Sequence, residues 1–257
     1  MTATSEIVAY LDTLLETSAI PDYTSALNGL QLANSGNVTR VAAAVDFSSR
    51  VVAQVVKERA DFLVVHHGMF WSGLKPITAS TYQRLKLLID NDVAVYSSHL
   101  PLDRHAVFGN NVLLSKLLDL TPSGEFAWTK GISIGLRGES DIPTTEIFEK
   151  AKLFSRSHGG DAISTTVAPD RRTRQWAMCT GAGASSETLQ EAQNLGVDTL
   201  IVGEGPHHTA VEADELGIAV IYAGHYATET LGVKAIAEHL AESFGIEGVM
   251  IHAPTGL

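Results

Sequence analysis

Short, continuously apolar runs alternate along the chain with segments whose apolar residues recur every three or four positions. Continuously apolar runs are typical of strands buried on both faces, and the longer spacing is typical of amphipathic helices. In the first half, this pattern predicts a helix after Ser5, then strands at 41–45, 62–65 and 93–96 that alternate with helices at 48–59, 80–90 and 107–119. Residues 28–38 are rich in Gly and Asn and are predicted to form a loop.

The second half repeats the alternation. Strands are predicted at 175–179, 199–202 and 218–222, with helices at 185–196, 207–216 and 227–243. Residues 121–174 are expected to add a strand, a helix and a strand, from "GISIGLRG", "TTEIFEKAKLF" and "DAISTTVAP". Strand–helix alternation predicts parallel sheets with right-handed crossovers. We therefore expect an α/β fold with two domains, residues 1–124 and 125–257.

The two halves align with each other. At an offset of 137, "VDFSS" (45–49) lies over "AGASS" (182–186), and "ADFLVVHHG" (60–68) lies over "VDTLIVGEG" (197–205). The similarity predicts two related α/β units that face each other about a pseudo-twofold axis.

A third pair of segments carries chemistry as well as similarity. At an offset of 126, "YSSHLPLD" (96–103) lies over "YAGHYATE" (222–229). His99 then matches His225, and Asp103 matches Glu229. Each half therefore places a histidine and a carboxylate four residues apart after the corresponding strand.

Histidines and carboxylates gather where the predicted strands end, which is where ligands bind in open α/β sheets. This mixture of imidazole and carboxylate suits Zn²⁺, Fe²⁺, Mn²⁺ or Ni²⁺. Two ions need a bridging carboxylate and several terminal ligands. We predict a metal site in the cleft between the units, with bridging carboxylates Asp103 and Glu229 and histidine ligands His66, His67 and His225.

Structural roles compete with metal binding at each of these positions. A histidine at a strand end is often only hydrogen bonded, the loop of Asp103 resembles an ordinary turn, and His225 with Glu229 also fits a helix N-terminus. Four other histidines are assigned to surface or packing roles: His105, His158, His239 and His252. For His207 and His208, at the start of a predicted helix, both a structural and a functional role stay open.

The segment "CTGAGASS" (179–186) offers a different interpretation. Gly181 and Gly183 match the first two glycines of a dinucleotide-binding fingerprint, but its sixth position is Ser186. A tight strand–helix turn explains the same residues, and its amides offer a place for an anionic group. The chain has no G-x-S-x-G nucleophile elbow.

Composition narrows the class of protein. Hydrophobic residues make up 45% and charged residues 18%, and no apolar run reaches membrane-spanning length. A net charge of −11 disfavours binding to nucleic acids or anionic membranes. The single cysteine, Cys179, is expected to be a small buried hydrophobic residue, and its isolation fits a reducing cytoplasm. The N-terminus has no signal-peptide pattern, so a cytoplasmic location is expected.

The ordered motifs resemble the NGG-interacting-factor-three-like family, whose members are called GTP cyclohydrolase I type 2 homologues. The resemblance spans nearly the whole chain and rests on these motifs: "NGLQ", "VVHHGMFW", "YSSHLPLD", "GNN", "TGAGAS", "VGEGPHH" and "GHYATE". It implies a dinuclear metal centre between two α/β domains and a toroidal homohexamer. It also implies the ligands named above, with His99 beside the centre and His208 lining the cavity. The chain is too short for the domain inserted in longer members.

Three functions follow as hypotheses. The first is a metal-dependent hydrolase that acts on a C–N bond of a small polar or heterocyclic substrate, with His99 as general acid or base. The second is a metal-trafficking or storage protein. The third is a regulatory interaction scaffold whose metals are structural. Five strong ligands with His99 and His208 nearby favour catalysis, because purely structural metal sites tend to be coordinatively closed.

Overall fold

The computed structural model describes residues 1–165 and 168–257, and the chain forms two compact units. Unit 1 comprises Met1–Leu102 and Gly232–Ala253, and unit 2 comprises Asp103–Leu231 and Pro254–Leu257. The first unit was expected to extend to residue 124. The division falls earlier because the segment after residue 103 packs its apolar side chains on the second sheet.

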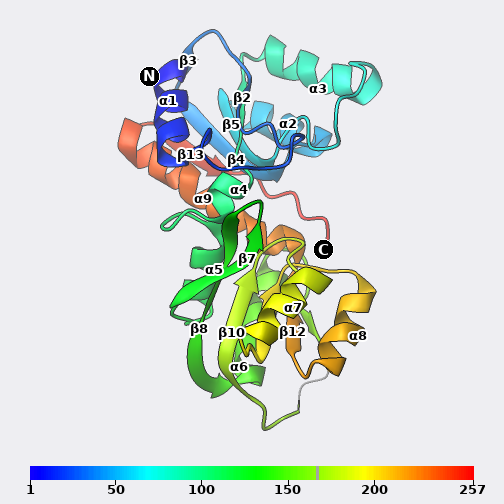
Figure 1. Ribbon diagram of the computed structural model, residues 1–257. Helices are drawn as coiled ribbons and strands as arrows, with labels where there is room; N and C mark the ends of the chain where they lie inside the picture. The colour runs from blue at the N-terminus through cyan, green and yellow to red at the C-terminus, as the bar shows by residue number, and fades with distance from the viewer. Residues whose placement is uncertain (166–167) are drawn as a thin grey trace. The chain divides into compact units, whose positions relative to one another are not determined.

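Unit 1 is built on a mixed sheet (Figure 1). Its strands, in spatial order, are β13 (Glu247–Met250), β4 (Arg40–Asp46), β5 (Phe62–His67), β6 (Ala94–Ser97) and β2 (Gly29–Leu32). The first four are parallel, whereas β2 runs antiparallel to β6. The predicted loop at 28–38 is therefore wrong. It contains β2 and also β3 (Asn37–Val38), which pairs with β1 (Thr2–Ala3).

Helices cover both faces of this sheet. The helices of unit 1 are α1 (Thr4–Leu14), α2 (Ser49–Lys57) and α3 (Ala79–Asp90), together with the C-terminal part of α9 (His225–Phe244). Leu63 and Val65 pack with α2 and α3 on one face. On the other face, the Tyr96 hydroxyl donates to Asp12 of α1 at 2.8 Å. Both faces are thus closed, which explains why these strands read as continuous apolar runs.

Unit 2 contains a six-stranded mixed sheet (Figure 1). Its strands, in spatial order, are β7 (Gly124–Thr129), β8 (Ile132–Pro143), β10 (Arg172–Cys179), β11 (Thr199–Val202), β12 (Ala219–Tyr222) and β9 (Ile163–Ser164). Only β10, β11 and β12 are parallel neighbours, so the expected wholly parallel sheet is wrong at its edges. The strand predicted from "DAISTTVAP" is β9 in part, and positions 166–167 lie outside the described residues.

Alternate residues of the central strands point to two helical layers. The helices of unit 2 are α5 (Asn110–Leu117), α6 (Thr144–Ser157), α7 (Ser186–Asn194), α8 (His207–Glu215) and the first turns of α9, and the short α4 (Leu100–Asp103) contains the boundary between the units. Trp176 and Met178 pack with α5 and α6, whereas Ala177 and Cys179 pack with α7 and α8. Cys179 is buried, as expected. The C-terminal ends of the parallel strands β10, β11 and β12 lie at one edge of the sheet, and the candidate site residues of unit 2 follow these ends.

Candidate metal centre

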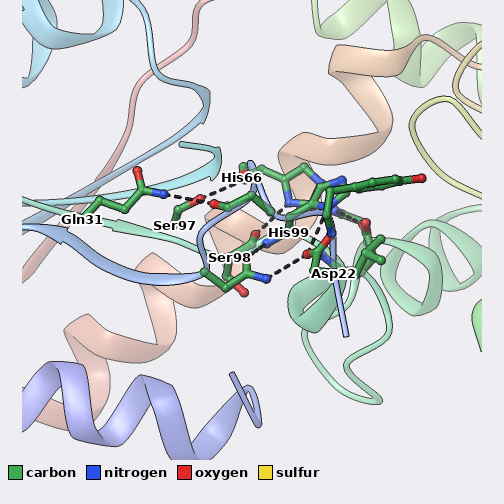
Figure 2. A network of polar contacts seen from close by, with 12 residues as sticks. Asp22, Gln31, His66, Ser97, Ser98 and His99 are labelled. Atoms are coloured by element: carbon green, nitrogen blue, oxygen red, sulfur yellow. Dashed lines mark hydrogen bonds and ion pairs between the residues drawn. The ribbon is translucent and has the colours of Figure 1, made fainter. Parts of the chain in front are cut away.

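Three buried histidines converge at the C-terminal edge of the unit 1 sheet. His66 and His67 are the last two residues of β5, and His99 follows β6. The ring centroids of His66 and His67 lie 4.9 Å apart, and His66 and His99 lie equally close. One ring nitrogen from each residue lies within 4.8 Å of the others. This group could hold a metal ion, and Figure 2 shows His66 and His99 in the network of polar contacts around it.

Each of these rings is held at Nδ1 by an oxygen atom. The His66 Nδ1 lies 2.9 Å from the carbonyl of Ser98, which only accepts a hydrogen bond. The Nδ1 of His67 lies 2.9 Å from Asp46 Oδ1, and the Nδ1 of His99 lies 2.9 Å from Asp22 Oδ1. A proton at Nδ1 leaves the lone pair at Nε2, the arrangement that orients metal-binding histidines.

Asp22 connects His99 to the backbone. Its Oδ2 accepts from the Leu100 amide at 2.9 Å and from the Asn28 side chain at 2.8 Å. The Asn28 Oδ1 in turn accepts from the His99 amide at 2.8 Å. Burial disfavours the charged carboxylate, but the hydrogen bonds from His99, Asn28 and the Leu100 amide outweigh burial and lower the pKa of Asp22. His99 is therefore fixed at both its ring and its backbone (Figure 2).

The segment after His67 is held in place by Gln31. The Gln31 Oε1 accepts from the Met69 amide at 2.6 Å, and its Nε2 donates to the Ala26 carbonyl at 3.0 Å. A Cβ on Gly68 would lie 2.5 Å from the Gln31 amide group, so a larger residue here would displace the Gln31 side chain. Beyond this turn, the Trp71 ring lies 4.5 Å from the rings of both His67 and His99.

In unit 2, Asp103 is fixed by two neighbouring elements. Its Oδ1 accepts from Asn110 of α5 at 2.8 Å and from the Thr180 hydroxyl at 3.4 Å. The Thr180 amide donates to Asn111 Oδ1 at 3.0 Å, which ties the end of β10 to α5. Asp103 is buried at 7% exposure, so these hydrogen bonds stabilise a carboxylate that would otherwise be costly to bury.

His225 and Glu229 occupy the first turns of α9, one helical turn apart. The His225 Nε2 lies 3.1 Å from Glu229 Oε2, and its Nδ1 lies 2.8 Å from Glu204 Oε1. Burial alone would lower the pKa of His225, but Glu229 and Glu204 raise it to about 9. His225 thus shows the same Nδ1–oxygen arrangement as the unit 1 histidines.

The glycines of "CTGAGASS" serve this arrangement. Gly181 has φ +63°, and a Cβ there would lie 2.2 Å from Glu229 Oε1. A Cβ on Gly183 would lie 2.1 Å from the Cys179 carbonyl. The turn between β10 and α7 therefore needs both glycines for close packing. This favours the tight-turn interpretation over a dinucleotide fingerprint.

The structure brings most of the predicted residues together within their own units. His66, His67 and His99 form one group in unit 1, and His225 and Glu229 form a pair in unit 2. The ligand and catalytic assignments themselves remain predictions. His208 lies exposed in the first turn of α8, and its predicted role in substrate binding also remains a prediction.

Sequence reasoning assigned no role to the residues that orient the histidines. Asp46 is the last residue of β4 and Glu204 follows β11, so strand-end position was a usable signal for both. Asp22 and Asn28 lie in the segment between α1 and β2, and no motif spacing connects them to His99. Trp71 is the last residue of the motif "VVHHGMFW", and no role was assigned to it from the sequence.

Fold and side chains define an α/β protein with two mixed sheets and a buried histidine cluster suited to metal ions. The family model for DUF34/NIF3 (NGG1p interacting factor 3) matches residues 2–255, and the chain belongs to this family.

Relatives and solved structures agree with that assignment. The chain is 39% identical over 252 residues to the GTP cyclohydrolase 1 type 2 homolog of Pyrococcus abyssi, covering 98% of each chain. A solved structure described as protein ybgI, of unknown function, matches with a TM-score of 0.88 and 32% identity over 100% of both chains. TTHA1606 from Thermus thermophilus matches with a TM-score of 0.85 and 33% identity over 100% of both chains.

Proposed function

We propose that the chain binds two divalent transition-metal ions, such as zinc, iron or manganese, and hydrolyses a C–N bond of a small polar or heterocyclic substrate. The observation that carries this proposal is the shared arrangement of His66, His67, His99 and His225. Each has its Nδ1 within 2.9 Å of an oxygen acceptor. Three of these rings, those of His66, His67 and His99, thereby present Nε2, the atom that a metal ion needs, whereas the Nε2 of His225 lies 3.1 Å from Glu229 Oε2.

The proposed ligands come from both units. Unit 1 supplies His66 and His67, and unit 2 supplies Asp103, His225 and Glu229. Their mixture of nitrogen and carboxylate oxygen suits a divalent transition metal and not a thiolate-bound one. Family membership supports assigning all five to one dinuclear centre, because the motifs that carry them are the ones by which the chain resembles the family.

The roles of the remaining residues follow from their contacts. Bound metal ions supply Lewis-acid activation of water and of the substrate. His99 exchanges a proton at Nε2, because Asp22 holds its Nδ1. Trp71 lies against the rings of His67 and His99 and shields them from bulk water. The relatives named GTP cyclohydrolase 1 type 2 homologs support a ring-opening or deaminating reaction on a heterocycle.

The decisive assay is turnover of a panel of C–N substrates, including GTP, by metal-loaded protein. We expect steady hydrolysis that is lost in Asp103→Ala while its circular dichroism is unchanged. His99→Gln should lose turnover but keep its metal content. If His99→Gln loses metal instead, His99 is a ligand and not the proton-transfer residue.

The same assay separates the alternatives. No turnover across the panel, with metal that exchanges readily into an acceptor chelator, would favour metal trafficking or storage. No turnover with metal retained for days would favour a scaffold with structural metals.

We also propose, from family membership, that the chain assembles as a homohexamer. No helix of the described residues is long and apolar enough to cross a membrane.

A further inference from the structure

A cavity of about 590 Å³ opens beside His67 and lies entirely within unit 1. Its volume is in the range of small-molecule binding sites. Asp46 and His67 border it on the side of the histidine cluster, and the cavity extends from there to the beginning of α3. A ligand in this space would therefore contact one of the proposed metal ligands.

The walls of this cavity combine aromatic and cationic side chains. Phe47, Phe70 and Trp71 give it an aromatic lining, and Lys75 and Arg84 give it two positive charges. The one carboxylate in the wall, Asp46, is hydrogen bonded to His67. In a chain with a net charge of −11, a cavity with more cations than carboxylates is a local exception.

The Arg84 guanidinium is held in place by contacts with Phe47 and Thr81. The guanidinium carbon lies 5.4 Å from the centre of the Phe47 ring, a cation–π distance. Its Nη2 donates to Thr81 at 3.4 Å. The Arg84 Nε is buried and has no hydrogen-bond partner among the described residues. Arg84 is half-buried, and its guanidinium, with an unused donor at the buried Nε, favours a planar anion, since the guanidinium donors match a carboxylate.

We propose that this cavity binds a small planar aromatic or heteroaromatic carboxylate. The carboxylate pairs with Arg84 and Lys75, and the ring lies against Trp71 and Phe47. Binding itself is independent of the metal ions. The further step, presentation of the ring to the histidine cluster for hydrolysis, rests on the function proposed above.

The test uses 2-naphthoate as the probe and isothermal titration calorimetry on the full-length protein. We expect a Kd of about 1 mM or tighter for 2-naphthoate. Neutral 2-naphthamide and non-aromatic cyclohexanecarboxylate should each bind at least tenfold more weakly. Arg84→Gln should weaken 2-naphthoate binding tenfold or more, and the exposed Lys75→Gln, which carries little folding risk, should weaken it several-fold. Arg156→Gln, an exposed residue of α6, is the matched control and should bind as the wild type does.

Absence of 2-naphthoate binding, equal binding of 2-naphthamide, or unchanged affinity in both Arg84→Gln and Lys75→Gln would overturn the proposal. Metal content is measured on the same samples. A wild type that binds 2-naphthoate in an Arg84-dependent way but holds no metal would support the cavity inference and refute the dinuclear centre. A metal-loaded wild type that ignores the probe would do the reverse.

Discussion

At the scale of single residues, four histidines on three different segments share one arrangement. His66, His67, His99 and His225 each place Nδ1 against an oxygen acceptor, although the acceptor differs from a backbone carbonyl to three carboxylates. Adjacency and strand-end position were enough to identify the histidines. The acceptors were harder to find, because Asp22 is 77 residues from His99 and no periodic pattern connects them.

Gly181 gives a direct test of the space around Glu229. Gly181→Ala places a Cβ at φ +63° and 2.2 Å from Glu229 Oε1. We expect lower stability and a lower metal content, because Glu229 must move. Gly196→Ala is the matched control, since Gly196 has φ +69° and nothing within 4 Å of the added Cβ. The control should lose only about 1 kcal/mol for the left-handed backbone and keep its metal. Urea denaturation and elemental analysis measure both, and equal behaviour of the two variants would contradict the assignment.

Asp22 makes stability depend on pH. Its pKa is lowered below the ordinary value of 3.8, so its charged form stabilises the fold above that value, and this contribution is lost as the pH falls through the folded-state pKa. Asp22→Asn in metal-free protein should lose about 1–3 kcal/mol at neutral pH, as expected for a buried hydrogen-bonded charge. The difference from wild type should shrink in acid.

The control for this variant is Asp161→Asn. Asp161 is exposed and paired with Arg156, which also lowers its pKa. Its effect should be small and should disappear at high salt, because surface ion pairs are screened. Urea midpoints at neutral and acidic pH give the comparison. A wild-type advantage over Asp22→Asn that is constant across pH would show that the lowered pKa of Asp22 plays no part.

At the scale of elements, one pair of helices has boundaries that match the offset found in the sequence. The α2 helix (Ser49–Lys57) and the α7 helix (Ser186–Asn194) are separated by the same offset of 137 that aligns the two halves. Each begins after a serine cap, and each connects parallel strands. Short apolar runs and serine caps are local signals, which is why these elements were predictable.

Edge strands were not predictable in the same way. The β2 strand (Gly29–Leu32) lies in a Gly- and Asn-rich segment, and its register with β6 shifts between Leu30 and Leu32. The β13 strand (Glu247–Met250) is short and partly exposed. Both take their conformation from pairing with a neighbouring strand distant in sequence, so local pattern carries little of the information.

The two caps differ in a way that denaturation can detect. Ser185 forms a capping box, with its hydroxyl 3.2 Å from the Thr188 amide and its own amide donating to the Thr188 hydroxyl at 2.9 Å. Ser48 makes one longer bond, 3.3 Å from the Val51 amide. We expect Ser185→Ala to lose about 1 kcal/mol and Ser48→Ala to lose less. Hydrogen exchange in the first turn of each helix should show the same order, and a reversed order would contradict it.

At the scale of the whole molecule, the chain divides differently from a simple cut near its middle. Unit 1 also includes Gly232–Ala253, because β13 pairs with β4 and extends the first sheet. A segment that belongs to the first unit but follows most of the second unit in sequence has no signature in hydrophobic periodicity. The number of units and their common α/β class were therefore predictable, whereas their boundaries depended on long-range strand pairing.

Assembly is tested at the same scale. If the chain forms the proposed homohexamer, analytical ultracentrifugation should give a mass about six times the 27.4 kDa of one chain. The mass should be independent of protein concentration in the micromolar range, as expected for a closed ring. A monomer or an open-ended series of species would contradict the proposal without affecting the metal site.

The central claim is that the histidines and carboxylates hold two metal ions. The most direct measurement is elemental analysis of the purified, metal-reconstituted protein beside a His66→Ala, Glu229→Ala double variant whose fold is checked by circular dichroism. We predict close to two transition-metal ions per chain in the wild type and loss of metal in the folded variant. A wild type that holds no metal after reconstitution, or a double variant that holds as much as the wild type, would contradict it.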